Sequence, residues 1–282
     1  MRQYNDLLKK VMDEGVDREG RNGKTRALFG QQMRFNMADG FPAMTTKKLA
    51  FKAVKSELLW FIEGSGDENR LKELNQSERT IWTDNAEAPY WKPKAKFDGD
   101  LGRVYGVQWR HWQKPNGGEV DQLANVIEMI KTDPGSRRLI VTAWNPGELD
   151  LMALPPCHMF FQFFVDPSST SGQAGKLSIF MHQRSCDMFL GVPFNIASYS
   201  LLLHMVAQAT NLQPGEFVHS LGDTHIYHDH FDAVSEQLAR EPLPLCTLKL
   251  NPAVKNIGDF KMEDIELENY QSHPPIKAKM AV

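Results

Sequence analysis

The stretch ALPPCHMFFQF, Ala153 to Phe163, contains residues whose types could do chemistry together. Pro155 and Pro156 fix the backbone φ angle and withhold two hydrogen-bond donors just before Cys157. A nucleophilic cysteine needs a fixed position and neighbours that favour its thiolate. An unpaired cysteine in an apolar run is more often a core residue, and His158 would point to the opposite face of a strand. The stretch makes Cys157 a candidate nucleophile without establishing a Cys–His pair.

Arginines beside a hydroxyl form a second group of candidates. Arg184 and Ser185 lie at the end of the strand-like run KLSIFMHQRS, and a guanidinium binds oxyanions such as phosphate with two hydrogen bonds. Arg137 and Arg138 open another strand-like run, and Arg21 lies in a glycine-bearing loop. A surface salt bridge is the commoner role of any single arginine. Together, in a chain of negative net charge, they indicate a site for one small anion.

Four further polar residues could recognise or act on a substrate. Asn195 heads an apolar helix, where its amide could cap the helix or read the O4/N3 edge of a uracil. His225 and Tyr227 share one face if the chain is extended there. Glu57 stands beside an apolar helix face, where burial would raise its pKa and let it move protons; an exposed helix charge is the alternative. The histidines of GDTHIYHDH lack a zinc-ligand pattern, so no metal is expected.

The composition restricts the class of protein. The chain has 282 residues, 41% hydrophobic and 24% charged, which is ordinary for a soluble globular protein. A formal net charge of -3 argues against a general binder of DNA or other nucleic acid. Three cysteines without CxxC spacing favour a reduced, cytoplasmic setting. The amphipathic N-terminus does not resemble a signal peptide, and no apolar run approaches the length of a membrane span.

The elements that must position these residues are helices and strands in irregular order. Apolar spacing predicts helices in YNDLLKKVMDEG, KAVKSELLWFIEG and VDQLANVIEMIKTDPGS, which stop at Gly15, Gly64 and Asp133 to Gly135. FNIASYSLLLHMVAQATNL, apolar on most faces, predicts a core helix. The strand predictions are RRLIVTAW, HMFFQFFVD and KLSIFMHQRS, the last two joined by a hairpin-type loop, with a proline-rich, strand-like C-terminal part.

This order favours an α+β fold with a mixed or antiparallel sheet over a doubly wound fold. DREGRNGKTRALFG is interpreted as a polar loop that runs into a strand. Residues 65–100 are polar, with short helical pieces and the proline-broken APYWKPKAKFDGD. We therefore expect residues 1–282 to form one domain, in which about 65–100 is a smaller, more exposed subregion.

Seven stretches, in order along the chain, resemble the thymidylate synthase family: ELLWF, GRVYGVQWR, SRRLIVTAWN, PPCH, QRSCDMFLGVPFNIASY, GDTHIY and PIKA. The resemblance runs over essentially the whole chain. It implies a homodimeric α+β fold in which the mixed sheet presents a face to the dimer interface. It also implies methylation of deoxyuridylate (dUMP) to thymidylate (dTMP), with 5,10-methylenetetrahydrofolate as the donor of both the carbon and the hydride, and dihydrofolate as the second product.

The resemblance also implies roles for individual residues. Cys157 is the nucleophile that adds to C6 of uracil, because C5 is a poor nucleophile until a thiolate has added. Glu57 organises proton transfer, Tyr105 lies near the C5 proton, His158 belongs to the surrounding polar network, and Asn195 reads the uracil edge. For the nucleotide, the assigned residues are Arg21, Arg184 and Ser185 at the phosphate, Arg137 and Arg138 from the other subunit, and His225 and Tyr227 at the ribose. For the folate they are Asp187 at the pterin, Trp82, Leu154 and Phe194 around it, Lys47 at the glutamate tail, and Val282 as the terminal carboxylate that closes over it.

Three positions depart from the family pattern. The loop that contains Arg21 is one residue shorter than usual, Asn85 replaces a frequent second tryptophan, and Lys279-Met280 replace a common proline and valine. Two other functions stay open. One is a pyrimidine-nucleotide hydroxymethylase of the same superfamily, in which water instead of hydride adds to the exocyclic methylene. In such an enzyme, Asn195 would favour uracil over cytosine as the base. The other is a catalytically silent homologue that binds nucleotide or RNA, against which the set of Cys157, Glu57 and Asn195 argues.

Overall fold

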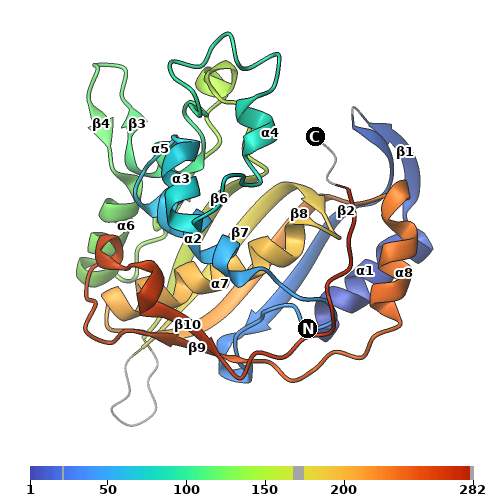
Figure 1. Cartoon of the computed structure of the whole chain (residues 1–282). Coiled ribbons are helices and arrows are strands. Elements are labelled where there is room, and N and C mark those ends of the chain that lie inside the picture. Colours follow the sequence, from blue (N-terminus) through green and yellow to red (C-terminus); the bar gives the residue numbers. More distant parts are fainter. Residues whose placement is uncertain (21, 168–174, 280–282) are drawn as a thin grey trace.

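A mixed six-stranded sheet forms the centre of the molecule (Figure 1). This computed structural model describes residues 1–20, 22–167 and 175–279. The strand order is β1-β2-β8-β7-β6-β5, with β7 and β8 parallel and the other neighbours antiparallel. The strands are β1 (Val16–Gly20), β2 (Gly23–Asn36), β5 (Ile140–Thr142), β6 (His158–Asp166), β7 (Lys176–Asp187) and β8 (Gln213–Tyr227). The expected α+β class with a mixed sheet is confirmed.

Helices and two small strand pairs complete the fold. The α-helices are α1 (Arg2–Glu14), α2 (Phe51–Ile62), α3 (Glu68–Asn75), α4 (Thr83–Ala86), α5 (Tyr105–Arg110), α6 (Gln122–Thr132), α7 (Gly191–Ala209) and α8 (Phe231–Leu238). The strand pairs are β3 (Trp112–Gln113) with β4 (Glu119–Val120), and β9 (Thr247–Leu250) with β10 (Ile265–Glu268). Short 3-10 helices cover Met37–Asp39, Pro146–Leu151, His228–His230, Ile257–Asp259 and Met262–Asp264. The helices at 2–14, 51–62 and 122–132 confirm the periodicity predictions.

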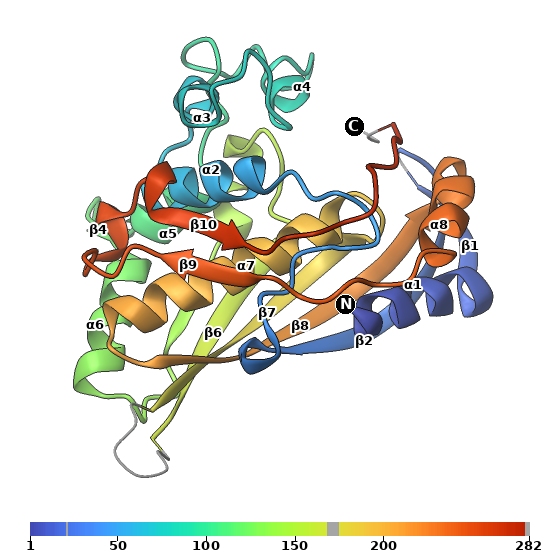
Figure 2. The same cartoon turned by 60° about the horizontal axis from the view of Figure 1, so that its bottom comes forward.

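Helix α7 is the crossover between the parallel strands β7 and β8 and packs against both. With α2 it lies over one face of the sheet (Figure 2). Leu201, Leu202 and Leu203 are consecutive and all fully buried, so the helix is enclosed on every side, as its uniformly apolar sequence predicts. It begins at Gly191, earlier than predicted. Its first turns therefore follow β7 closely and lie near the strand ends that carry Arg184 and Asp187.

Three boundary predictions are wrong in part. Residues 16–20 form β1, paired with β2 from Val16–Ala27 to Gly20–Gly23, where the sequence predicted a loop. All five are exposed, so the strand lacks the alternating pattern that signals a half-buried strand. Of RRLIVTAW only residues 140–142 are a strand, and the C-terminal part holds β9 and β10 between irregular segments.

The segment that includes α3 and α4 stands above α2 (Figures 1 and 2). It is polar in sequence, yet Glu68, Trp82 and Trp91 in it are almost completely buried. Trp82 and Trp91 belong to the same hydrophobic core as the residues of α2, so the segment packs onto the rest of the chain. No helix in the described part of the chain combines the length and the apolar character that crossing a membrane requires.

Candidate active site

Cys157 lies just before β6, on a backbone held from the neighbouring strand. Arg184 of β7 donates from Nε to the carbonyl of Pro156 (2.8 Å) and from Nη2 to that of Pro155 (3.0 Å). Its backbone N–H donates to the carbonyl of Cys157 at 2.8 Å. The two prolines fix φ, and Arg184 anchors their carbonyls. Hydrogen bonds from Arg184 thus hold the backbone before Cys157 and at Cys157 itself, and this fixes the position of the sulfur.

The environment of the Cys157 thiol has opposing effects on its pKa. Burial raises the pKa above its usual value, because a thiolate is poorly solvated there. The positive charge of Arg184 and hydrogen bonds with the hydroxyls of Tyr105 and Ser185 oppose that rise. We expected the arginines to favour the thiolate. Arg184 does so, but burial is the larger effect and the net shift is upward.

Tyr105 and His158 pack as one aromatic unit beside Cys157. The hydroxyl of Tyr105 accepts the backbone N–H of Cys157 at 2.7 Å, and its ring stacks on that of His158 with centroids 4.1 Å apart. Nδ1 of His158 shares a hydrogen bond of 2.8 Å with the hydroxyl of Tyr199 on α7. Burial lowers the pKa of His158 to about 3, so this imidazole is neutral. It contributes a polar group and no charge.

Glu57 of α2 faces the same region and bonds to Trp82. The indole Nε1–H of Trp82 donates to Oε1 of Glu57 at 2.7 Å. Burial raises the pKa of Glu57 to about 7, and the indole hydrogen bond limits the rise because it favours the carboxylate. Of the two roles considered for Glu57, a proton-transfer group and an exposed helix charge, the geometry favours the first.

The start of α7 brings Asp187, Phe194 and Asn195 together. Oδ1 of Asp187 accepts from the backbone N–H groups of Phe189 (3.0 Å) and Leu190 (3.1 Å) and so orders the turn into the helix. A methyl group placed on Gly191 would lie 3.8 Å from both Oδ1 of Asn195 and Cβ of Asp187. Asn195 lies inside the helix, whose N-cap position is Leu190. It therefore does not cap α7, and its half-buried amide is available for recognition.

The residues predicted to hold the ribose lie at the end of β8. His225 and Tyr227 are on one face of that strand, with ring centroids 5.3 Å apart. Nδ1 of His225 lies 3.1 Å from Oδ1 of Asp223. The other carboxylate oxygen of Asp223, Oδ2, pairs with Nη1 of Arg18 in β1 at 2.6 Å. The parallel register places Asp187 opposite His225 and Ser185 opposite Asp223. The β7–β8 pair thus joins the predicted phosphate and ribose residues.

Lys47, predicted at the glutamate tail, is buried. Its Nζ donates to the carbonyl of Phe189 and lies 3.4 Å from the centre of the Phe189 ring. Burial lowers its pKa to about 7, while the charge of Asp187 opposes this shift. Lys47 thus stabilises the turn before α7 through these two contacts with Phe189. Leu154 is half-buried, and contact of either residue with folate stays a prediction.

Arg137 and Arg138 are exposed in this chain, just before β5. Among the described residues, these two arginines form hydrogen bonds only through their backbone groups. For example, the side-chain amide of Gln162 donates to the carbonyl of Arg137. They are not brought to Cys157 within one subunit. Arg21 and Val282, also predicted in the site, lie outside the described residues.

The comparison with known families agrees with this arrangement. The family model described as thymidylate synthase matches residues 2–282. The chain belongs to the thymidylate synthase family. The match spans the chain from α1 to the C-terminal part, and the assignment of Cys157, Glu57 and Asn195 to one site stays a prediction.

Several residues of this family member support the site but were not predicted. The ring of Trp144 packs against Arg184, with the guanidinium carbon 5.2 Å from the ring centre. Tyr199 forms a hydrogen bond with His158, and Asp223 forms one with His225. Glu68 accepts a hydrogen bond from the segment before Trp82. Trp144 is the last residue of the predicted strand RRLIVTAW, which was an available signal. The others act through contacts between distant elements, which no local pattern reveals.

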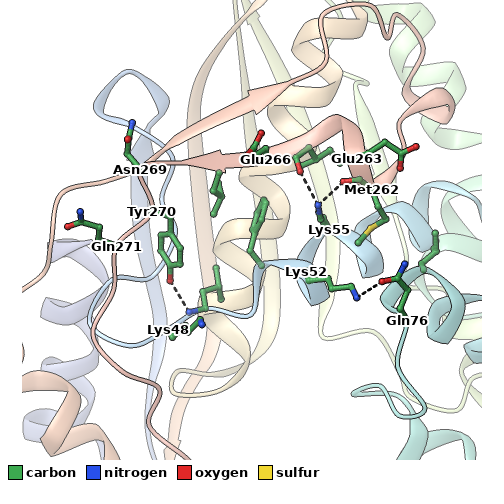
Figure 3. A pocket seen from close by; sticks show the side chains of 15 residues that line it. Lys48, Lys52, Lys55, Gln76, Met262, Glu263, Glu266, Asn269, Tyr270 and Gln271 are labelled. Carbon is green, nitrogen blue, oxygen red and sulfur yellow. Dashed lines mark hydrogen bonds between the residues drawn. The ribbon is translucent and has the colours of Figure 1, made fainter.

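A separate pocket of about 870 Å³ lies between α2 and the β9–β10 pair (Figure 3). Among the side chains around it, Lys55 donates to the carbonyls of Met262 (2.7 Å) and Ile265 (3.0 Å), and Tyr270 accepts from the N–H of Leu49. None of the predicted site residues lines it. Within residues 1–20, 22–167 and 175–279, no cluster of three or more His, Cys, Asp or Glu side chains could hold a metal ion.

Proposed function

We propose that this protein methylates dUMP reductively to dTMP, with 5,10-methylenetetrahydrofolate as donor and dihydrofolate as second product. Membership of the family supports a methylation-type reaction on dUMP, and the family uses methylenetetrahydrofolate. The observation that carries the proposal is the meeting of Cys157, Tyr105 and Arg184 at one backbone position, with Glu57 facing the same region.

In the first step the sulfur of Cys157 adds to C6 of the uracil ring. The C5–C6 electron pair moves toward O4, and the resulting enolate makes C5 nucleophilic. The thiol must first lose its proton, a loss that Arg184, Tyr105 and Ser185 favour against the effect of burial. After the one-carbon unit has joined C5, the C5 proton must leave and the bond between that carbon and the folate must break. The folate, when bound, would supply a hydride to this carbon, and the sulfur would be expelled from C6 as the C5–C6 double bond re-forms, which would give dTMP and dihydrofolate and restore the free thiol.

Glu57 and Tyr105 move protons during these steps. With a pKa of about 7, Glu57 is present in both protonation states near neutral pH, the range in which a general acid or base is most effective. The hydroxyl of Tyr105 accepts the N–H of Cys157, and burial raises its pKa well above the usual value, so it stays neutral. It therefore suits relay of the C5 proton through hydrogen bonds and does not act as a base by itself. The neutral His158 keeps Tyr105 in place by stacking.

The nucleotide is held by groups from the β7–β8 strand ends and α7. Arg184 and Ser185, with Arg21, bind the phosphate; His225 and Tyr227 hold the ribose. The amide of Asn195 matches the uracil edge, since it offers one donor and one acceptor. The half-buried state of Asn195 and its position within α7 support this role.

The residues around Asp187 fit a folate ring system. The half-buried Leu154 and Phe194 offer apolar contact, and among the described residues the hydrogen bonds of the Asp187 carboxylate use only Oδ1. Oδ2 is thus free to accept from an amino group of a pterin. Trp82, Lys47 and Val282 complete the proposed folate set. The folate supplies a one-carbon unit and a hydride when bound.

We also propose a homodimer in which Arg137 and Arg138 bind the phosphate in the partner's site. One face of the sheet carries Phe160 and Phe180, whose rings lie 6.2 Å apart, and Phe164, which is 67% exposed. Exposed aromatic residues of this kind on a sheet mark an interface. The three cysteines are all free thiols, which suits the reduced cytoplasm in which we expect the enzyme to act.

Identification of the products tests the proposed function. Purified protein is incubated with dUMP and 5,10-methylenetetrahydrofolate, and the nucleotide products are identified by mass. We expect dTMP, with dihydrofolate in equal amount. Cys157→Ala should abolish turnover and keep dUMP binding, whereas Cys186→Ala, at a fully buried cysteine, should retain activity. Formation of 5-hydroxymethyl-dUMP without dihydrofolate would make the protein a hydroxymethylase, and absence of any product would make it a silent homologue.

A further inference from the structure

A buried carboxylate outside the proposed catalytic set connects α3 to the start of α4 and the residues just before it. Glu68, the first residue of α3, is 1% exposed. Its Oε1 accepts hydrogen bonds from the hydroxyls of Thr80 (2.8 Å) and Thr83, and its Oε2 pairs with Nζ of Lys72 at 3.1 Å. A buried carboxylate is costly unless such partners satisfy it. The group is therefore a tight, directional attachment for residues 80–83.

The attached segment carries Trp82. The hydroxyl oxygen of Thr80 accepts the backbone N–H of Trp82 at 3.1 Å, and the backbone N–H of Thr80 donates to the hydroxyl of Thr83 at 3.0 Å. Both threonines thus bind the Trp82 backbone segment and Glu68 at the same time. The indole N–H of Trp82 then bonds to Glu57.

Two kinds of contact restrain the indole. Its ring packs against Trp60 and Tyr105, with centroids 5.7 and 5.8 Å away, which restricts the plane of the ring. The hydrogen bonds of Thr80 and Thr83 fix the backbone from which the ring projects. A hydrogen bond weakens steeply when its donor is displaced or rotated, so the Trp82–Glu57 bond depends on that backbone anchor.

We propose that Glu68 is a positioning residue, which holds the Thr80–Thr83 segment so that the indole N–H of Trp82 stays on the carboxylate of Glu57. The inference rests on the proposed role of Glu57 in proton transfer. It adds a residue in a different helix that acts on Glu57 only through Trp82. Loss of the anchor weakens a hydrogen bond that favours the ionised form of Glu57, so its pKa rises further.

The test removes the threonine hydroxyls without changing side-chain shape. Thr80→Val/Thr83→Val and Glu68→Gln are compared with Thr80→Ser/Thr83→Ser, which keeps both hydroxyls, and with Glu73→Gln, an exposed glutamate of the same helix. Nitrogen-15 labelling of tryptophan gives the indole signal of Trp82, assigned with Trp82→Phe, and its titration reports the ionisation of Glu57. The acid limb of kcat against pH is measured in parallel.

We expect the Val/Val and Glu68→Gln variants to raise the midpoint of the titration and of the acid limb by about 0.5 to 1 pH unit. The Ser/Ser and Glu73→Gln variants should match the wild type. An unchanged indole midpoint in a folded Val/Val variant would overturn the proposal. If Val/Val does not fold, Thr83→Val alone decides by the same titration. The indole signal does not depend on product identity, so failure of the proposed function is distinguishable from failure of this inference.

Discussion

At the scale of single residues, burial and hydrogen bonding set the protonation of the site. Burial raises the pKa of both Cys157 and Glu57. For Cys157 the effect of burial exceeds that of Arg184 and of the hydroxyls of Tyr105 and Ser185, so the net result favours the thiol, which limits unwanted alkylation and oxidation. For Glu57 it moves the pKa to about 7, where the group can both accept and donate protons. The same desolvation therefore protects the proposed nucleophile and adjusts the pKa of the proposed proton-transfer group.

The raised pKa of Glu57 predicts a pH-dependent cost in stability. The folded state binds the Glu57 proton more tightly than the unfolded state, so this group's contribution to stability is lost as pH rises from the ordinary glutamate range through about 7. Glu57→Gln removes the ionisation while it keeps the shape. We expect Glu57→Gln to match the wild type near pH 4.5 and to be more stable by up to about 3 kcal/mol above pH 8. Urea unfolding at both pH values measures this difference, and an equal difference at the two pH values would contradict it.

At the scale of elements, the contact between α2 and α5 positions Glu57 relative to Tyr105. Gly106 follows Tyr105 directly, and a Cβ placed on it would lie 2.5 Å from the carbonyl oxygen and 2.7 Å from the Cα of Phe61 in α2. Real Cβ atoms do not approach backbone atoms this closely. Only glycine at this position allows the two helices their observed spacing.

Gly106→Ala should therefore force α5 away from α2. We expect a loss of about 1 to 3 kcal/mol in the free energy of unfolding, with a fall in turnover because Tyr105 moves with the helix. Gly135→Ala is the matched control, since a Cβ there meets nothing within 4 Å; its stability should change by less than about 0.5 kcal/mol. Equal effects of the two substitutions in chemical unfolding would show that the spacing is not limited at Gly106.

The elements were predictable where one face of the sequence is apolar. Helix α6 lies at Gln122–Thr132, with Leu123, Val126, Ile127 and Ile130 buried as their spacing predicts. Strand β1 was missed because it pairs with β2 through its backbone while all its side chains are exposed. The start of α7 was placed too late because Gly191 and Pro193 are helix-breaking residue types, yet both lie in the first turn, where a proline costs no hydrogen bond within the helix.

The candidate site was predictable in its residue types and less so in its contacts. Cys157, Arg184 and Asn195 stand out by type and setting, and the family resemblance gave them roles. The hydrogen bond from Trp82 to Glu57 and the attachment of Thr80 and Thr83 to Glu68 join different elements. Such contacts depend on how α2, α3 and the segment before α4 pack, and no periodicity encodes that. The buried position of Lys47 likewise follows from its packing on Phe189.

At the scale of the whole molecule, the predicted phosphate site is incomplete within one chain. Arg184 and Ser185 belong to β7, whereas Arg137 and Arg138 are exposed before β5, at the far edge of the strand order. Exposed apolar side chains also mark one face of the sheet, among them Phe164, which is 67% exposed and shares its face with Phe160 and Phe180. A second copy related by twofold symmetry would cover such a face and bring the same arginines of each chain to the other's site.

If each active site contains residues from both subunits, mixing two inactive variants should restore activity. In Cys157→Ala the nucleophile is lost and the arginines remain; in Arg138→Glu the reverse holds. A heterodimer of the two has one site with both lesions and one with neither, so random exchange of subunits should restore about a quarter of wild-type activity.

A mixture of Cys157→Ala with Glu57→Gln is the control, because both residues belong to the same subunit's site and no intact site can form. Sedimentation and a mass tag on one variant verify the dimer and the exchange. Recovery confined to the Arg138→Glu mixture supports the shared site, whereas verified exchange without recovery would show that Arg138 acts within its own chain.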